Sequence, residues 1–319
     1  MTAVFDNAYE AIIDADSDAR WAFGTGFENP LAGVDTSLPP DVDGADLAAY
    51  CLMLGDDALI MSHRLQQWCT RLPELEEEVA VANIGLDLLG QARLLLSRAG
   101  AARAGADGID GGRVAEDAPP DGRAWEDHYA FFRDEHEYRN VRLAELENGD
   151  FGELTARLLV FSTWRLALLN RLTESTDPVL SAIAAKGVKE VTYHRDYAAQ
   201  WTVRLGDGTD ESHQRMQAGL DAVWPYVDEL FVAHPVEERL AAGGAPDSAA
   251  VAVDPSTLRT EFDDVLVHVL KASTLRRPDL AATPGIAGRT GRDGVHTEAM
   301  GFLLAEMQSV ARAHPEGVW

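Results

Sequence analysis

Acidic side chains and histidines near the middle of long helices are the residues of this sequence that could bind metal. In di-metal four-helix bundles, two core helices each supply a Glu, and the other two each supply Glu-x-x-His. Residues three apart share a helix face, so one carboxylate and one imidazole reach the same ion. This mixed set of ligands suits iron or manganese. The motif Glu-x-x-His is absent from the sequence.

Asp-x-x-His is the nearest substitute, and it occurs twice. The two pairs are Asp210 with His213 and Asp293 with His296. Both lie in or beside expected turns, where a rigid mid-helix ligand pair is not expected.

Four mid-helix residues are better placed, but they form an incomplete set: Asp87, Glu135, Glu190 and His194. Non-ligand residues stand where further ligands would be needed, namely Gly90, Ser162 and Tyr193. Buried polar groups of this kind need hydrogen-bond partners and can fix helix register. The sequence therefore predicts a degenerate remnant, with no catalytic, cofactor-binding or metal-binding residue in this chain.

Apolar spacing predicts the helices that position these residues. Leu47, Cys51, Leu54, Ala58 and Met61 recur every four or three residues, as on a buried helix face. A proline followed by an acidic run opens the next helix, which we expect at 73–98. Further helices are expected at 125–146, 150–174, 178–205, 211–232, 256–276 and 297–313. No segment shows the period-two alternation of a strand.

The order of these helices predicts the fold class. Two antiparallel pairs, at about 47–98 and 150–206, are separated by an intervening segment. This order is typical of an all-α, ferritin-like four-helix bundle with additional helices, and a generic helical array is the alternative. We expect two parts, an acidic N-terminal extension at 1–46 and the ferritin-like helical domain at 47–319.

Charge and composition exclude several classes of protein. Asp and Glu number 53 against 27 Lys and Arg, a formal net charge of −26, and only three of the basic residues are lysines. Nucleic acids and anionic membranes both require a basic surface, so neither is an expected partner. The dispersed acidic surface suits a salt-rich cytoplasm. The two cysteines, Cys51 and Cys69, form no close pair and predict free buried thiols.

Several segments together resemble the PaaC-type, structural (beta) subunit of the ring-1,2-phenylacetyl-CoA epoxidase, a multicomponent oxygenase. They include LGDDALI at 54–60, PELEEE at 73–78, LDLLGQAR at 86–93, ENGDF at 147–151, LGDGT at 205–209 and LAEMQ at 304–308. The resemblance covers about residues 47–319. Residues 1–46 extend beyond the usual start of the family. Ala299 stands where the family pattern leads us to expect His.

The resemblance implies a cytoplasmic, non-catalytic subunit that pairs with and stabilises a related catalytic subunit. The di-iron centre is expected in that partner, with no cofactor in this chain. Further complex subunits and a reductase that delivers electrons complete the system, which epoxidises phenylacetyl-CoA in aerobic phenylacetate degradation.

Two other hypotheses stay open. One is a catalytically active ferritin-like di-metal oxidase that uses Asp87, Glu135, Glu190 and His194. The other is a free-standing helical scaffold for an unrelated partner.

Overall fold

The computed structural model describes residues 31–72, 74–107, 119, 122–242 and 250–317. Within these ranges the chain is helical, and the only bridge of β type is an isolated one between Ile286 and Arg289. The expected all-α fold class is therefore confirmed. Most of the expected N-terminal extension, residues 1–30 of 1–46, lies outside the described residues.

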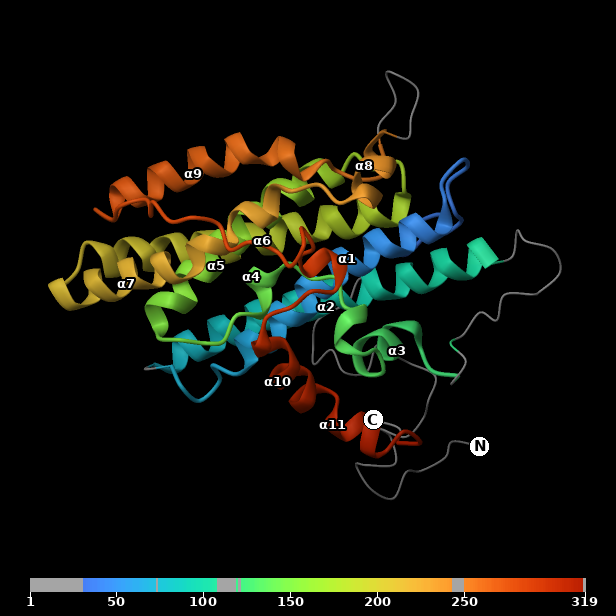
Figure 1. Ribbon diagram of the computed structural model, residues 1–319, viewed down its shortest axis with the longest axis horizontal. Helices are drawn as coiled ribbons and strands as arrows, with labels where there is room; N and C mark the ends of the chain where they lie inside the picture. Colours follow the sequence, from blue (N-terminus) through green and yellow to red (C-terminus); the bar gives the residue numbers. More distant parts are fainter. Residues whose placement is uncertain (1–30, 73, 108–118, 120–121, 243–249, 318–319) are drawn as a thin grey trace, which may run out of the picture.

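Four long helices form the bundle, as Figure 1 shows: α1 (Gly44–Gln66), α2 (Leu75–Asp107), α5 (Phe151–Leu172) and α6 (Pro178–Gly206). α1 packs most extensively on α2, and α5 packs on α6. An aspartate side chain caps the first backbone N–H groups of three of them, namely Asp43, Asp150 and Asp177. The expected antiparallel pairs are confirmed, although α2 continues past residue 98 to Asp107.

The expectation of one helix at 125–146 is wrong. The chain instead forms α3 (Trp125–Phe131), a 3-10 turn at Glu135–Glu137 and the short α4 (Arg142–Glu145). Two carboxylates of α1 interrupt the helix by binding its backbone: Asp56 accepts the N–H of Arg139 at 2.9 Å, and Asp57 accepts the N–H of Val141 at 2.8 Å. These bonds take the place of the backbone hydrogen bonds that a continuous helix would form between residues 132 and 141.

Shorter helices cover the ends and sides of the bundle: α7 (Asp210–Val223), α8 (Pro235–Ala242), α9 (Arg259–Ala272), α10 (Glu298–Met307) and α11 (Ser309–Ala313). The segment expected as one helix at 211–232 becomes two 3-10 turns after Val223, because Pro225 lacks the N–H that would continue α7. The segment at 297–313 divides at Gln308 into α10 and α11.

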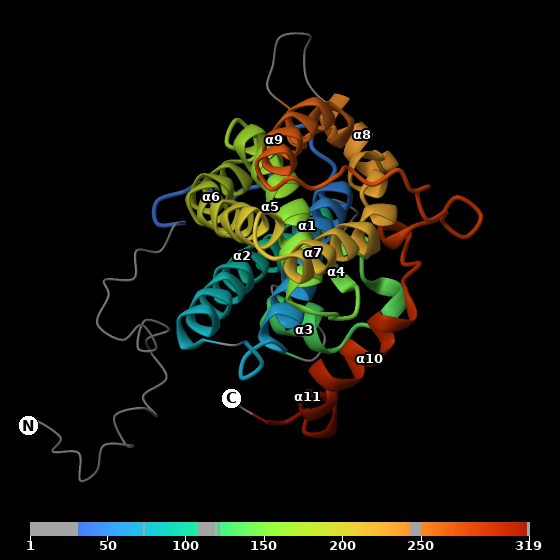
Figure 2. The same cartoon turned by 90° about the vertical axis from the view of Figure 1, so that its left-hand side faces the viewer.

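A close crossing of α5 and α7 depends on a glycine. A Cβ atom at Gly219 would lie 2.6 Å from the backbone nitrogen of Glu153, inside any real contact distance. The two helix backbones therefore meet directly. In the view of Figure 2, α2 and α6 lie along one side of the bundle, while α4, α8 and α10 lie along the other.

α2 is unusual in its apolar length. By length and composition alone, residues 75–104 could cross a membrane, and core helices of soluble proteins pass the same test. Only 44% of its most apolar window is buried. One side of α2 thus carries more apolar surface than the rest of the described chain covers.

A cationic centre in the bundle

Arg165 occupies the interior of the bundle at the middle of α5. Its side chain is 1% exposed, and its Nε donates to Gln91 Oε1 of α2 at 3.0 Å. Both terminal nitrogens point at the backbone oxygen of Leu54 of α1, each at 3.4 Å. Burial lowers the pKa of the Arg165 guanidinium to about 10, against the opposing charge of Asp57. The side chain therefore remains a cation at neutral pH, at a cost in free energy.

The hydrogen-bonded chain continues from α2 to α6. Gln91 Nε2 donates to Glu190 Oε2 at 2.9 Å, and the other carboxylate oxygen of Glu190 pairs with Lys186 Nζ at 2.8 Å. Gln91 is 2% exposed, so its amide orders Arg165 on one side and Glu190 on the other. The Glu190 carboxylate thus has its own ammonium partner besides the guanidinium nearby.

One turn along the same two helices, His194 and Asp87 meet. His194 Nε2 lies 3.0 Å from Asp87 Oδ2; the imidazole is 1% exposed and the carboxylate 37% exposed. Their spacing places Asp87 one turn before Gln91, and His194 one turn after Glu190. The structure therefore brings together three of the four expected remnant residues, Asp87, Glu190 and His194, along the α2–α6 contact.

The fourth expected residue, Glu135, lies elsewhere. It belongs to the 3-10 turn at Glu135–Glu137, and its Oε2 lies 3.0 Å from the position of a Cβ on Gly301 of α10. Residues 134–140, which fall inside the helix expected at 125–146, form this turn and the loop after it. Tyr193 is 52% exposed, so its expected place at an interior metal position is also wrong. Ser162 is buried and donates to the backbone oxygen of Leu158 at 2.6 Å.

The two Asp-x-x-His pairs have separate partners. His213 Nδ1 lies 2.7 Å from the backbone oxygen of Gly206. Asp293 accepts the backbone N–H of Thr290 at 3.0 Å. His296 lies 2.7 Å from Glu145 Oε2 through Nδ1, and 3.2 Å from the backbone oxygen of Tyr138 through Nε2.

The neighbouring aspartates of α1, Asp56 and Asp57, are fully buried ion-pair partners. Asp56 binds Arg133 through both carboxylate oxygens. Asp57 binds Arg292 at 2.9 and 3.0 Å. The same guanidinium donates to the backbone oxygen of Arg139 at 2.8 Å. These pairs attach the segments around residues 133 and 292 to the bundle.

The residues at the centre do not fit a di-metal pair. Among the residues that the structure describes, no three His, Cys, Asp or Glu side chains are grouped to hold a metal ion. The oxygen donors are already bonded, Glu190 to an amide and an ammonium and Asp57 to a guanidinium. A divalent ion would have to enter beside the Arg165 cation, and like charges repel in a low-dielectric interior. The centre is organised around basic side chains.

Comparison with known proteins agrees with this architecture. A sequence model of the family described as "Phenylacetic acid catabolic protein" (PaaA_PaaC) matches residues 33–319. The chain belongs to this family. It is 42% identical over 274 residues to the C subunit of the 1,2-phenylacetyl-CoA epoxidase of Escherichia coli (strain K12), an alignment that covers 86% of this chain and 99% of the relative.

Sequence reasoning missed Arg165 and Arg292 as the organising residues. For Arg165 a signal existed: it is the one charged residue in the apolar run LLVFSTWRLALL at 158–169 of α5. A lone arginine mid-way along a core helix must find buried partners. Arg292 gave no comparable signal, because it lies in a glycine-rich segment where a surface position is the ordinary expectation.

Proposed function

We propose that this chain is a non-catalytic structural subunit of a multicomponent di-iron monooxygenase that epoxidises phenylacetyl-CoA in aerobic phenylacetate degradation. It pairs with and stabilises a catalytic subunit that carries the di-iron centre. Further subunits and a reductase complete the complex in the cytoplasm. The identity to a subunit of a phenylacetyl-CoA epoxidase, over nearly the whole length of that relative, supports this assignment.

The observation that carries the non-catalytic role is the cationic centre. Arg165 and Lys186 lie among the acidic residues that could otherwise serve as ligands. A guanidinium and an ammonium supply the positive charge that metal ions supply in a di-metal bundle, and neither can activate dioxygen. The chain retains the fold while its interior is neutralised by its own side chains.

Metal analysis of the separate subunits tests the proposal. The chain is purified alone and in complex with the related family member from the same genome that is taken as the catalytic subunit, and iron is measured per subunit. We expect substoichiometric iron in the chain alone. In the complex, the amount of iron should be proportional to the amount of the partner subunit. Near-stoichiometric iron in the chain alone would contradict the non-catalytic role.

Glu190→Gln separates this proposal from an active oxidase. The amide keeps an acceptor for Gln91 but loses the carboxylate that a metal would need. The proposed structural role predicts unchanged iron content and unchanged epoxidation by the reconstituted complex. An oxidase that uses Asp87, Glu190 and His194 predicts the loss of both together.

A further inference from the structure

The outer face of α2 carries an apolar stripe that the described chain leaves uncovered. Leu75, Val79, Leu86 and Leu89 are exposed, and their spacing places all four on one side of the helix. Leu86 and Leu89 are 57% and 41% exposed. Single exposed leucines are ordinary, but a stripe along several turns marks an interaction surface.

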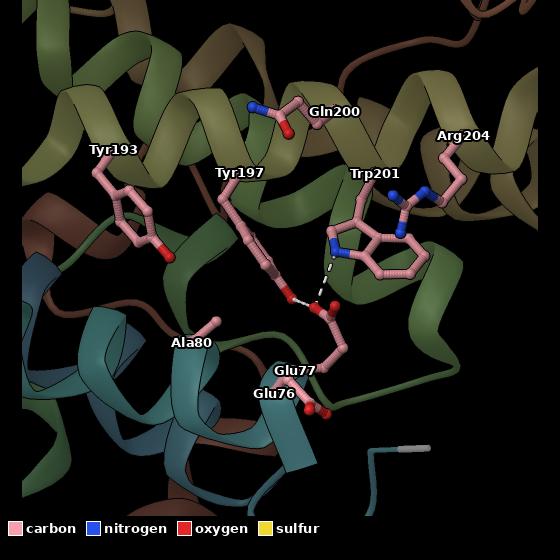
Figure 3. Close-up of a pocket in the computed structure, with 8 residues that line it drawn as sticks. All are labelled: Glu76, Glu77, Ala80, Tyr193, Tyr197, Gln200, Trp201 and Arg204. Atoms are coloured by element: carbon pink, nitrogen blue, oxygen red, sulfur yellow. Dashed lines mark hydrogen bonds between the residues drawn. The ribbon is translucent and has the colours of Figure 1, made fainter. Parts of the chain in front are cut away.

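An aromatic hollow of about 280 Å³ lies between the start of α2 and the second half of α6. As Figure 3 shows, Tyr193, Tyr197 and Trp201 descend from α6 toward Glu77 of α2. Glu77 Oε2 accepts hydrogen bonds from the Tyr197 hydroxyl and, at 2.9 Å, from Trp201 Nε1. Glu76 stands exposed at the rim.

These contacts prepare the hollow for a basic side chain. Glu77 fixes the two rings in place, so little side-chain entropy remains to be lost on binding. Aromatic faces attract cations, and Arg204 of this chain already lies over the Trp201 ring, 4.5 Å from its centroid. An entering cation therefore meets the Tyr193 and Tyr197 rings, and the two neighbouring carboxylates add an opposite charge. Tyrosine and tryptophan are also the residues that most often dominate the energy of protein interfaces.

The charge of α6 differs from that of the whole chain. α6 has four basic side chains, Lys186, Lys189, Arg195 and Arg204, against two acidic ones, Glu190 and Asp196. Two of the three lysines in the sequence lie on this helix. The net charge of −26 repels both anionic lipid and a second copy of the chain, whereas a locally balanced face accepts a protein partner.

We propose that the α2–α6 face, defined by the apolar stripe and the aromatic hollow, is the docking surface for another α-helical subunit of the same epoxidase. The partner presents a helix whose apolar stripe covers Leu86 and Leu89. A lysine or arginine of that partner enters the hollow beside Glu76 and Glu77. This inference rests on the proposed function, because it takes the catalytic subunit as the partner.

The test uses the full chain and the related family member from the same genome that is taken as the catalytic subunit. The wild-type chain is compared with L86E/L89E, which places two charges in the stripe, and with E76K, which reverses the charge at the rim. The matched control is V232E/V267E, which alters two valines outside this face that are at least as exposed on average, 61% and 54%. The dissociation constant of each complex is measured, together with the thermal midpoint of each chain alone.

The stripe variant should raise the dissociation constant by at least about tenfold, and the control should leave it unchanged. E76K should weaken binding severalfold, by an amount that shrinks as salt screens the charge. All four chains should unfold at nearly the same temperature when alone.

Other results overturn the inference in distinguishable ways. A wild-type complex that tolerates L86E/L89E leaves the proposed function standing and removes this surface from it. No wild-type complex at all removes the proposed function, and the docking surface with it. A dimer of the chain alone, or binding to anionic vesicles, that L86E/L89E abolishes assigns the face to a different occupant. A lowered thermal midpoint of L86E/L89E alone shows that the chain covers its own stripe.

Discussion

Replacing Arg165 by methionine should stabilise the isolated chain, although the substitution removes the hydrogen bond to Gln91 and two longer ones to the Leu54 backbone oxygen. Burial lowers the pKa of Arg165 to about 10 despite the nearby Asp57 charge. A fall of that size from the ordinary pKa corresponds to roughly 3 kcal/mol against the charged side chain. Methionine matches the length of the arginine stem and needs no hydration. Buried ion pairs replaced by packed apolar side chains are often neutral or more stable.

The loss of the bond to Gln91 offsets part of this gain. A hydrogen bond from a charged donor contributes about 1.5–3 kcal/mol to stability. Arg165→Met should therefore raise the free energy of unfolding by about 1 kcal/mol, and at the least leave it unchanged. The nearby carboxylates stay paired after the substitution, because Asp57 still binds Arg292 and Glu190 still binds Lys186. Arg165 is thus a surplus cation in the centre.

Arg292→Met is the matched comparison, because Arg292 is a second buried arginine. For Arg292 the neighbouring carboxylates outweigh the effect of burial on the pKa, whereas for Arg165 burial prevails. Burial alone would lower the pKa of Arg292, but the charges of Asp57 and Glu237 outweigh burial and raise it. Its removal leaves Asp57 buried without its cation and should cost about 3–5 kcal/mol. Urea unfolding followed by circular dichroism, with the slope m checked for constancy, measures both changes. If Arg165→Met destabilises the chain as much as Arg292→Met, Arg165 is no surplus cation.

Three further predictions concern other buried groups. Burial lowers the pKa of His296, but the hydrogen bond and charge of Glu145 outweigh burial and raise it above 6.5; the stabilisation from this pair should therefore be complete below pH 6.5 and disappear as the pH rises through the folded pKa. Thermal midpoints from pH 6 to 9 should fall for the wild type and fall less for His296→Gln. Burial raises the pKa of the Cys51 thiol, so a thiol reagent should label the half-buried Cys69 in the native chain and reach Cys51 only in denaturant; equal labelling rates would refute this. Gly219→Ala should cost at least about 2 kcal/mol in urea unfolding, because its Cβ would lie 2.6 Å from a backbone nitrogen of α5.

The four long helices could be predicted because their signals are local. Apolar spacing defines the buried face of each helix, and Pro178 directly after the capping Asp177 marks the start of α6. The acidic first turn that follows residue 73 marks the start of α2 in the same way. Such signals need no knowledge of the tertiary contacts.

The segment from 132 to 148 could not be predicted in the same way, because distant side chains decide its conformation. Asp56 and Asp57 take its backbone N–H groups across more than 80 positions of sequence. Arg64 then donates to the backbone oxygen of Glu145 at 2.8 and 3.0 Å. Read alone, the segment has helical spacing, and tertiary hydrogen bonds override it.

The residues of the candidate site also separate into those that local spacing predicts and those that only tertiary contacts determine. Glu190 and His194 could be placed on one face because they lie one turn apart on α6. That Asp87 of α2 meets His194 follows only from the packing of the two helices. Glu135 could not be excluded from them without knowing that its helix is broken. Arg165 was missed because its partners, Gln91 and the Leu54 carbonyl, come from two other helices.

The acidic residues of α1 show how this bundle uses the positions that face its interior. Asp56 and Asp57 each bind a buried arginine from a distant segment, and these arginines in turn hold backbone oxygens around residues 137–139. Glu190, on the opposite helix pair, is neutralised by Lys186. The positive charge of the interior is therefore covalently part of the chain, so its charge balance does not depend on a supply of metal.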